Sequence, residues 1–577
     1  MRWLRIAPAH RPAGVTAGRM MASQQQTVPD TAPASGTRDE EQRPRPARRW
    51  LVPLLVVVLL AQMAAAMVTT AVQQTPTIDE PVYVATAAEY LHGQGIRYNP
   101  EHPPLGKLVI AAGVAVADPH VDTSYRGPQI GLGPHLLYES GNDPWQLMFW
   151  GRLPVIVLTL LFGLVVFAFA RELAGRAAGL AALALYAFSP DVVAHGSLAT
   201  LDVPTAGFLL TSVWLSWRAR VRPRLYLPLA GLALGAALAT KMSALAAVPV
   251  LLGLAAVSVW SACRDAGMRR RLLRALAGAA VVAVAATAVV WASYLVVDPR
   301  LRWTSQDAVP VVHGLRGTLV ELLPFPQAYA DGMRLQFHFE NYPWEGFLFG
   351  RVYTGHLWYY LPAALLVKTP LGLLALWALG AVVLVAVRRL RPAAPYLLVP
   401  AGVLLASAMT GSRDFGTRYA LFLPMFLTVA AGCVLAVRRR WATVVTGVLV
   451  LFVAVSSLLA FPYYLPYANE AFGGPSRTHL RLHDSNVDWG QDLGRLADRL
   501  RERYPDERIW LVYKGSGVPS AYGIEASDPR AAPIDDVRGL LVVSDSSVAK
   551  AKGRLAELID SSRPVDEVGH SITIYRR

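Results

Sequence analysis

Residues 51–72 read LVPLLVVVLLAQMAAAMVTTAV, a stretch that contains no charged side chain. A helix needs about 20 consecutive apolar residues to cross a hydrocarbon layer of about 30 Å. A helix on the surface of a soluble protein would instead carry polar residues along one face. The stretch therefore predicts a membrane-spanning helix.

Ten further apolar runs of similar character follow along the chain. Of the 577 residues, 54% are hydrophobic and 16% are charged, whereas a soluble protein carries about 25% charged residues. We therefore predict an all-α polytopic membrane protein with about eleven spans. After 51–72, the predicted spans are 152–170, 176–190, 203–217, 225–240, 244–261, 273–297, 371–388, 395–410, 418–436 and 442–461.

The basic residues predict the orientation of these spans. The net charge is +15, and arginines cluster in short loops at 218–224, 264–274, 388–391 and 438–440. Such loops stay in the cytoplasm during membrane insertion. We therefore expect a multi-pass protein of the cell (plasma) membrane, with a cytoplasmic N-terminus and an extracytoplasmic C-terminus. Because the positive charge follows the membrane pattern, a nucleic-acid partner is not expected.

The sequence divides into three regions. Residues 1–49 are rich in Arg, Pro and Ala and lack an apolar period, which predicts a disordered cytoplasmic segment. Residues 50–461 form the predicted transmembrane domain, with two long extracytoplasmic loops at 73–150 and 298–370. Residues 462–577 carry both helical and strand patterns, which predicts a small extracytoplasmic α/β domain.

The elements expected in this last domain can be placed from their apolar periodicity. An amphipathic helix is expected over 489–503, and a second helix over 547–559. Strands are expected at 509–513, 540–544 and 571–575.

The first long loop opens with an acidic pair, Asp79-Glu80, followed by a helical stretch at 82–92. Acidic residues favour the first turn of a helix, so the pair can be an ordinary solvated helix start. Alternatively, these carboxylates are catalytic groups held at the membrane surface.

The same loop continues with His102-Pro103-Pro104-Leu105-Gly106-Lys107. The two prolines can start the helix predicted over 105–117, which places Lys107 in its first turn. Lys107 can extend its ammonium group to the lipid interface, or it can bind a phosphate through charge-assisted hydrogen bonds.

The turn between the third and fourth predicted spans contains Asp191, His195 and Asp202. An ionisable side chain close to hydrocarbon is costly, so Asp202 is a candidate functional group. Asp202 can also cap the helix that begins at Val203, and the two roles are compatible.

Three more cations lie at span ends on the same predicted side: Lys241, Lys368 and Arg418. Taken singly, each is most simply an anchor at the lipid interface. Together with Lys107 they bring four cations to the side that carries the carboxylates, and the planar guanidinium of Arg418 suits a phosphate.

Three histidines, His102, His195 and His356, are candidate contacts to a substrate or a metal ion. Two carboxylates with His102 or His195 nearby would permit a divalent cation. No cofactor is required by this set of residues.

In their order along the chain, these motifs resemble the GT-C membrane glycosyltransferases, in the branch that holds the protein O-mannosyltransferases and the aminoarabinose transferase of lipid A. The resemblance extends over about residues 51–436. Its motifs are Asp79-Glu80, the run from His102 to Lys107, Leu198 to Pro204 with Asp202, Lys368-Thr369-Pro370, and Arg418-Tyr419.

A second resemblance concerns the C-terminal region. The run from Asp484 to Leu493, DSNVDWGQDL, resembles a stretch in uncharacterised bacterial members of the same superfamily. The protein O-mannosyltransferases carry a different extra domain, inserted in a loop, so the resemblance does not imply a protein acceptor.

The resemblance implies a hexosyltransferase that uses a polyprenyl-phosphate sugar as donor and inverts the anomeric centre. It implies Asp79 as the general base, with Glu80 and Asp202 as further catalytic carboxylates. The residues implied to bind the donor phosphate are Lys107, Lys241, Lys368 and Arg418. The acceptor can be a glycan, a lipid or a protein.

Two other function classes fit parts of the sequence. A lipid or sugar transporter, or flippase, would share the helices, but it predicts inverted repeats and helices broken near the membrane centre. We find no repeat in the sequence, and the charged residues lie at one predicted face. A non-catalytic subunit for envelope assembly would leave the charged loop residues unexplained.

Overall fold

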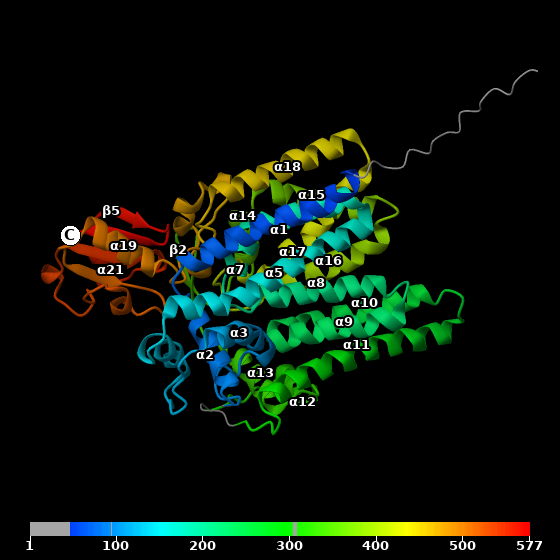
Figure 1. The fold of residues 1–577 in the computed structure, drawn as a ribbon, viewed down its shortest axis with the longest axis horizontal. Helices are drawn as coiled ribbons and strands as arrows, with labels where there is room; N and C mark the ends of the chain where they lie inside the picture. Colours follow the sequence, from blue (N-terminus) through cyan, green and yellow to red (C-terminus); the bar gives the residue numbers. More distant parts are fainter. Residues whose placement is uncertain (1–46, 94, 304–307) are drawn as a thin grey trace, which may run out of the picture. The chain divides into compact units, whose positions relative to one another are not determined.

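The computed structural model of the chain describes residues 47–93, 95–303 and 308–577 (Figure 1). The predicted disordered segment 1–49 lies outside the described residues except for 47–49, which begin the first helix. Residues Trp50–Arg577 form one unit, so the C-terminal region is packed together with the membrane helices.

Each of the eleven predicted spans contains a helix in the structure. The helices are α1 (Ala47–Gln73), α5 (Pro144–Ala174), α6 (Arg176–Ala187), α8 (Asp202–Arg218), α9 (Pro223–Thr240), α10 (Val248–Ala262), α11 (Met268–Val297), α15 (Leu371–Ala386), α16 (Ala394–Ala408), α17 (Phe422–Gly432) and α18 (Arg440–Leu459).

The number of membrane spans is smaller when judged by helix length and hydropathy. Five of the described helices can cross a bilayer alone, and up to seven can do so when each bent pair counts as one span. The prediction of eleven is not confirmed by this criterion, because α8, α16 and α17 have 17, 15 and 11 residues.

Two helices are sharply bent at prolines. The axis turns by 62° between α6 and α7 (Pro190–Gly196), and by 118° between α14 (Tyr360–Lys368) and α15. Pro190 is the first residue of α7, and Pro370 directly precedes α15. Proline lacks the N–H that would continue the preceding helix and has the φ of a first helical residue. Each bend therefore places a new helix start close to the end of the previous helix.

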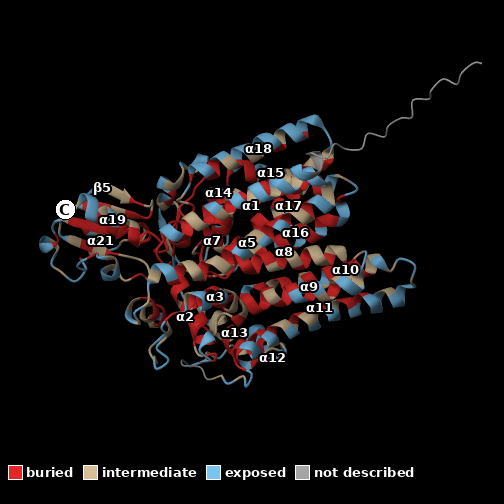
Figure 2. Cartoon of the chain, in the orientation of Figure 1, coloured by how far each residue is buried: buried red, intermediate tan, exposed pale blue. Residues whose placement is uncertain are grey.

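The outer helices expose apolar side chains. Only 22% of the apolar window of α1 and 28% of that of α18 is buried inside the protein. Leu54, Val58, Val444 and Leu451 are exposed, and Figure 2 shows exposed residues along both helices. Such surfaces would be unfavourable in water, but they match the hydrocarbon of a bilayer. The helices thus support the membrane class that the sequence predicts.

The first long loop is folded. It contains α2 (Glu80–Leu91), α3 (Pro104–Ala117), α4 (Gln129–Pro134) and the π-helix η1 (His135–Glu139). Helix α3 packs against α5, and a side chain on Gly113 would place its Cβ 1.8 Å from the carbonyl oxygen of Trp150. The absence of a side chain at Gly113 therefore permits this close approach.

The second long loop is also folded. It contains α12 (Gly314–Leu322), α13 (Gln327–Glu340), the strands β1 (Glu345–Leu348) and β2 (Arg351–Thr354), and α14. Strands β1 and β2 form an antiparallel hairpin in which Glu345 pairs with Thr354.

The C-terminal region has the mixed α/β character that its sequence predicts. It contains α19 (Leu493–Arg503), β3 (Ile509–Val512), β4 (Leu540–Ser544), α20 (Asp545–Ala549), α21 (Arg554–Asp560), β5 (Arg563–Val568) and β6 (Ile572–Arg576). The sheet order is β3-β4-β6-β5, and only the pair β3–β4 is parallel.

Three details of this region differ from the predictions. Helix α19 begins at Leu493 and not at 489, because residues 484–492 are taken up in contacts with the membrane part. The helix predicted over 547–559 is two short helices, interrupted at Gly553, which has a φ of +52°. Strand β5 was not predicted, because its residues do not alternate clearly between apolar and polar.

Candidate active site at the helix ends

Four charged side chains from separate helix ends meet as two ion pairs. Arg418 donates from Nη1 to Oδ2 of Asp79 at 2.5 Å, and Lys241 donates from Nζ to Oδ1 of Asp202 at 2.5 Å. The pairs adjoin, because the ring of Tyr419 contacts the cations of both. The ring of Tyr419 lies 5.0 Å from the Arg418 guanidinium carbon and 5.4 Å from Lys241 Nζ.

The local structure explains how these side chains come together. Asp79 directly precedes α2, and Asp202 is the first residue of α8. Lys241 directly follows α9, and Arg418 lies in the 3-10 turn η4 (Thr417–Ala420) before α17. All four positions are at the helix ends that the sequence predicts to face away from the cytoplasm.

The two neighbouring acids, Asp79 and Glu80, have very different surroundings. The Asp79 side chain is 28% exposed, whereas that of Glu80 is 0% exposed and ion-paired with Arg152. Glu80 accepts hydrogen bonds from Arg152 Nε at 2.7 Å and Nη2 at 2.6 Å, and from the backbone N–H groups of Thr77 and Ala199. Its carboxylate is therefore occupied by the protein, and only Asp79 is open to a substrate.

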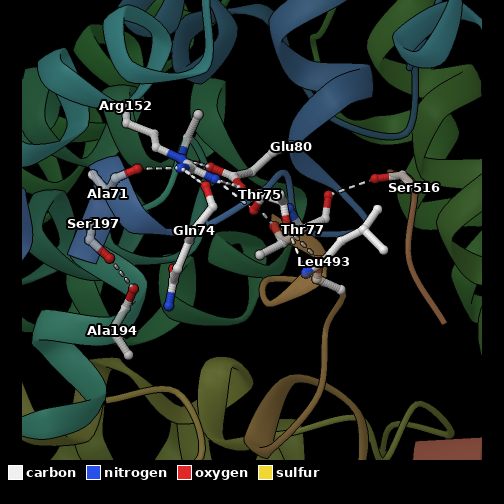
Figure 3. Close-up of polar contacts among 12 residues, drawn as sticks. Ala71, Gln74, Thr75, Thr77, Glu80, Arg152, Ala194, Ser197, Leu493 and Ser516 are labelled. Carbon is white, nitrogen blue, oxygen red and sulfur yellow. Dashed lines mark hydrogen bonds and ion pairs between the residues drawn. The ribbon is translucent and has the colours of Figure 1, made fainter. Parts of the chain in front are cut away.

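Arg152 is a structural residue that the sequence analysis missed. Besides Glu80, it donates to the backbone oxygens of Ala71, Gln74 and Thr75, at the end of α1 and in the segment that follows (Figure 3). The signal was present in the sequence, because Arg152 is the first residue of a predicted span and a buried charge there needs partners. Glu80 and Arg152 together fix the backbone beside Asp79.

Lys107 is buried and its ammonium group is used within its own loop. It donates to the backbone oxygen of Asn99 at 2.8 Å, to Asn99 Oδ1 at 3.2 Å and to the backbone oxygen of His102 at 2.8 Å. Burial lowers the pKa of Lys107 to about 7. This geometry favours a role in fixing the loop, and its predicted contact with the donor phosphate stays a prediction.

Lys368 is likewise used by the protein. It donates to the backbone oxygens of Leu465 at 2.5 Å and Asn486 at 3.0 Å, and its Nζ lies 3.7 Å from Oδ1 of Asp191. These contacts join the bend between α14 and α15 to the bend between α6 and α7. This geometry favours a structural role for Lys368, and its predicted contact with the donor phosphate stays a prediction.

The three predicted histidines lie in different surroundings. His102 is half-buried with its ring edge-on to Tyr83, at 5.6 Å between ring centres. His195 is fully buried, and its ring packs against Trp489 at 6.0 Å. His356 is exposed between β2 and α14. Of the three, His195 adjoins the ion pairs through Trp489, which also contacts Arg418.

No group of three or more His, Cys, Asp or Glu side chains that could hold a metal ion occurs in the part of the chain that the structure describes. The two carboxylates of the cluster, Asp79 and the buried Asp202, face Arg418 and Lys241. The divalent cation that the sequence permits stays a prediction.

Trp489 is the second site residue that the sequence analysis did not identify. Its ring is 4.4 Å from the guanidinium carbon of Arg418, and its side chain is fully buried. The run from Asp484 to Leu493 was singled out in the sequence, but spacing alone could not show that it reaches Arg418.

The comparisons with known proteins agree with the class that the motifs suggest. Residues 56–298, less than half of the chain, match the family model described as dolichyl-phosphate-mannose-protein mannosyltransferase. The matched segment includes Asp79, Asp202 and Lys241, whereas Arg418 and Trp489 lie beyond it. No curated protein matches the chain in sequence.

Three solved structures are similar to the chain at low identity. ArnT from Cupriavidus metallidurans in the apo state is 16% identical with a TM-score of 0.44, over 92% of this chain and 98% of that one. The Archaeoglobus fulgidus oligosaccharyltransferase is 13% identical with a TM-score of 0.41, over 80% and 59%. The S. cerevisiae Pmt1-Pmt2 complex bound to the sugar donor is 18% identical with a TM-score of 0.33, over 43% and 33%.

The resemblance predicted from the motifs is thus confirmed by the family match. Residues 56–298 are similar to the dolichyl-phosphate-mannose-protein mannosyltransferases, the branch that the motifs of the sequence indicate.

Proposed function

We propose that this chain is a membrane glycosyltransferase that moves a hexose from a polyprenyl-phosphate donor to an extracytoplasmic acceptor, with inversion at the anomeric carbon. The observation that carries the proposal is the Asp79–Arg418 pair, in which a partly exposed carboxylate and a guanidinium lie 2.5 Å apart. The family match supports the donor class, because the family is named for transfer from a lipid phosphate sugar.

The pair supplies the two groups that this reaction needs. Asp79 accepts the proton of the acceptor hydroxyl as the acceptor oxygen bonds to the anomeric carbon. The bond from that carbon to the phosphate oxygen breaks, and the electron pair leaves with the polyprenyl phosphate. Positive charge must then meet the negative charge that grows on the phosphate.

The ion pair between Asp79 and Arg418 links proton uptake by the base to stabilisation of the leaving phosphate. While Asp79 is ionised, it holds Nη1 of Arg418. Once Asp79 carries the proton it is neutral, so the guanidinium can turn its charge to the leaving phosphate. Nε of Arg418 has no hydrogen-bond partner among the described residues, so it is a further donor for a phosphate oxygen. Asp202 orients the acceptor beside this pair, and its partner Lys241 remains a predicted ligand of the donor phosphate.

An apolar groove fits the lipid part of such a donor. It lies between α3, α5 and α8, has a volume of about 380 Å³ and is lined by apolar side chains that include Val109, Trp150 and Phe208. The same α8 begins with Asp202. A polyprenyl chain in this groove would have its phosphate end on the elements that carry the charged side chains.

A transporter is the second candidate, and the two bent helix pairs favour it. Transporters use broken helices to line a path through the membrane. Here, however, the charged residues at the bends, Asp191 and Lys368, are buried against each other and against the C-terminal segment. This arrangement closes the bends with protein groups, so we favour the transferase.

The experiment uses purified full-length protein in lipid vesicles supplied with polyprenyl-phosphate hexoses. Water can replace the acceptor, so we expect slow release of free sugar together with equal amounts of polyprenyl phosphate. Transfer of the intact donor across the bilayer without cleavage would instead support the transporter. The absence of cleavage with all hexose donors would contradict the proposed function.

A further inference from the structure

The C-terminal run from Asp484 to Leu493, here called the clamp segment, is buried along its whole length. It follows the 3-10 turn η7 (Pro475–Leu480), ends at the first residue of α19 and contributes no strand to the sheet. Its polar side chains, such as Asn486 and Gln491, are buried and hydrogen-bonded. Burial of polar side chains costs free energy unless they are hydrogen-bonded. The hydrogen-bond partners of the clamp segment therefore indicate its role.

One side of the clamp segment holds the backbone that leads to Asp79. The N–H of Ile78 donates to the backbone oxygen of Trp489, and that of Thr75 to the oxygen of Gln491, each at 3.0 Å. Thr75 Oγ1 also accepts from the N–H of Leu493 at 3.1 Å. Residues 74–79 are outside any helix, so these bonds take the place of secondary structure.

A neighbouring loop of the same domain adds to this side. Ser516 Oγ donates to the backbone oxygen of Thr77 at 2.9 Å. Figure 3 shows Leu493 and Ser516, from the C-terminal region, beside the Thr75–Thr77 backbone together with Arg152 and Glu80, which belong to α5 and α2. The approach to Asp79 is therefore fixed from both directions.

The other side of the clamp segment holds the turn that carries Arg418. Asn486 Oδ1 accepts from the N–H of Thr417 at 3.1 Å, and Ser485 Oγ donates to the backbone oxygen of Phe415 at 2.7 Å. The two loops of the Asp79–Arg418 pair are far apart in the sequence, yet one short segment bonds to both.

Trp489 contacts the guanidinium itself. A cation over the face of an indole ring is attracted to its electron density, and the ring of Trp489 lies 4.4 Å from the Arg418 guanidinium carbon. Contact with the face leaves the N–H groups of Arg418 free to donate in its plane. The backbone that carries this indole is held in turn by Gln491, whose Oε1 accepts from the backbone N–H of Trp489 at 2.8 Å and whose Nε2 donates to the backbone oxygen of Val487 at 2.9 Å.

We infer that Trp489 is a positioning residue of the active site and that the C-terminal domain completes this site through the clamp segment. This inference rests on the proposed function: the indole holds the Arg418 guanidinium so that its N–H groups point at Asp79 and at the leaving phosphate. The clamp segment bonds both to the loop that leads to Asp79 and to the turn that carries Arg418, so it supports the two together.

Hydrogen–deuterium exchange of the full-length protein in vesicles tests the support directly. The variants are Trp489→Leu, Trp489→Phe and Asn486→Ala. The matched control is Trp510→Leu, because Trp510 is equally buried in the same domain but is bonded to the oxygen of Arg538 in its own sheet region. We expect faster exchange at Ile78 and Thr417 in Trp489→Leu, and at Thr417 in Asn486→Ala, with no change there in the control.

Donor cleavage by the same variants tests the consequence. We expect Trp489→Leu to lower kcat/KM for the polyprenyl-phosphate hexose by about tenfold or more, since the stacking interaction is lost. Trp489→Phe should retain most of the activity because it keeps an aromatic face, and Trp510→Leu should retain nearly all of it. If the effect came only from the packing of this domain, Trp489→Phe and Trp510→Leu would lose activity together with Trp489→Leu. That result would contradict a specific role of the Trp489 ring.

The two proposals fail in different ways. Exchange at Ile78 and Thr417 that is unchanged in all three clamp variants overturns the inference, and so does a wild-type kcat/KM in Trp489→Leu. Absence of donor cleavage by the wild type overturns the proposed function, and with it the catalytic role of Trp489, whatever the exchange rates are.

Discussion

At the scale of single residues, two adjacent acids divide two tasks. Glu80 has no exposed surface and is enclosed by Arg152 and backbone N–H groups, whereas Asp79 is partly exposed and faces Arg418. The chain therefore uses one carboxylate to hold the backbone and offers the neighbouring one for chemistry. The difference in exposure arises because the two side chains point in different directions at the start of α2, although the residues are adjacent in the sequence.

This division predicts that substitutions of the two acids differ strongly in their effect on protein stability. Glu80→Ala should destabilise the protein by about 3–5 kcal/mol, because it leaves the buried guanidinium of Arg152 without its partner. Asp79→Asn should cost much less, since that side chain is partly exposed and the amide oxygen of Asn can still accept from Arg418. Thermal unfolding in detergent, followed for both variants and the wild type, measures the difference. Equal loss of stability in the two variants would contradict the division.

The sequence identified the charged residues but not their pairing. Asp79 and Arg418 are separated by 339 positions, so only the folded helices bring them together. Their common side could be predicted from the alternation of spans and arginine-rich loops. Lys107 could not be placed for a different reason, although its partners are close in the sequence. Its ammonium group donates to the backbone oxygens of Asn99 and His102, and these bonds depend on a loop conformation that the residue types do not define.

At the scale of elements, the predicted spans all contain helices, but their boundaries and bends depend on packing. The bends before α7 and α15 occur at prolines, Pro190 and Pro370. A proline indicates where a helix starts but not the angle to the preceding helix, so these angles could not be predicted. The long loops are rich in helices that pack on the bundle, and α3 lies against α5 where Gly113 permits contact. The contact between α3 and α5 shapes the apolar groove assigned to the donor lipid.

The groove predicts that donor use depends on chain length. Ala112 lines it, so Ala112→Phe should fill part of it and raise KM for a long polyprenyl-phosphate hexose by about tenfold, the effect of losing burial of one large apolar side chain. A donor with one or two isoprene units should be affected much less. Val444→Phe on the exposed face of α18 is the control. Equal changes for long and short donors would remove the groove from the account.

The clamp segment predicts a pH dependence of stability. Burial raises the pKa of Asp488 to about 7, above its value in an unfolded chain, so the folded state binds a proton that the unfolded state has lost. Stability is therefore expected to fall as pH rises from about 4 to about 7 and to level off above that.

Asp488→Asn should raise the thermal stability at pH 8 and flatten this dependence, because the amide needs no proton to be neutral. Unfolding curves of the variant and the wild type between pH 5 and pH 8 provide the measurement. A wild-type pH profile in the Asn variant would show that other groups cause it.

At the scale of the whole molecule, the arginine-rich loops and the ion pairs lie at opposite helix ends. The loops at 218–224, 264–274, 388–391 and 438–440 lie at the predicted cytoplasmic ends of the spans. The paired residues lie at the opposite ends, either just after a span or at the start of one. The C-terminal domain bonds to the same ends as the ion pairs. The side of the membrane on which this domain lies therefore shows the side on which the ion pairs, and the proposed reaction, lie.

A reporter fused after Arg577 tests this location. We expect an alkaline-phosphatase fusion to be active, since that enzyme needs an extracytoplasmic environment, and a fusion ending at Arg391 to be inactive. The reverse pattern would place the ion pairs in the cytoplasm and would contradict both the topology and an extracytoplasmic acceptor.

The most direct test of the central claim is the initial rate of polyprenyl-phosphate hexose cleavage in vesicles, for the wild type and for Asp79→Asn. Asp498→Asn is the control, because it neutralises an exposed acid on α19. With Asp79 as the general base, the Asp79→Asn rate should fall by about 10²- to 10⁴-fold, while the control keeps the wild-type rate. Cleavage by Asp79→Asn at the wild-type rate would contradict the claim.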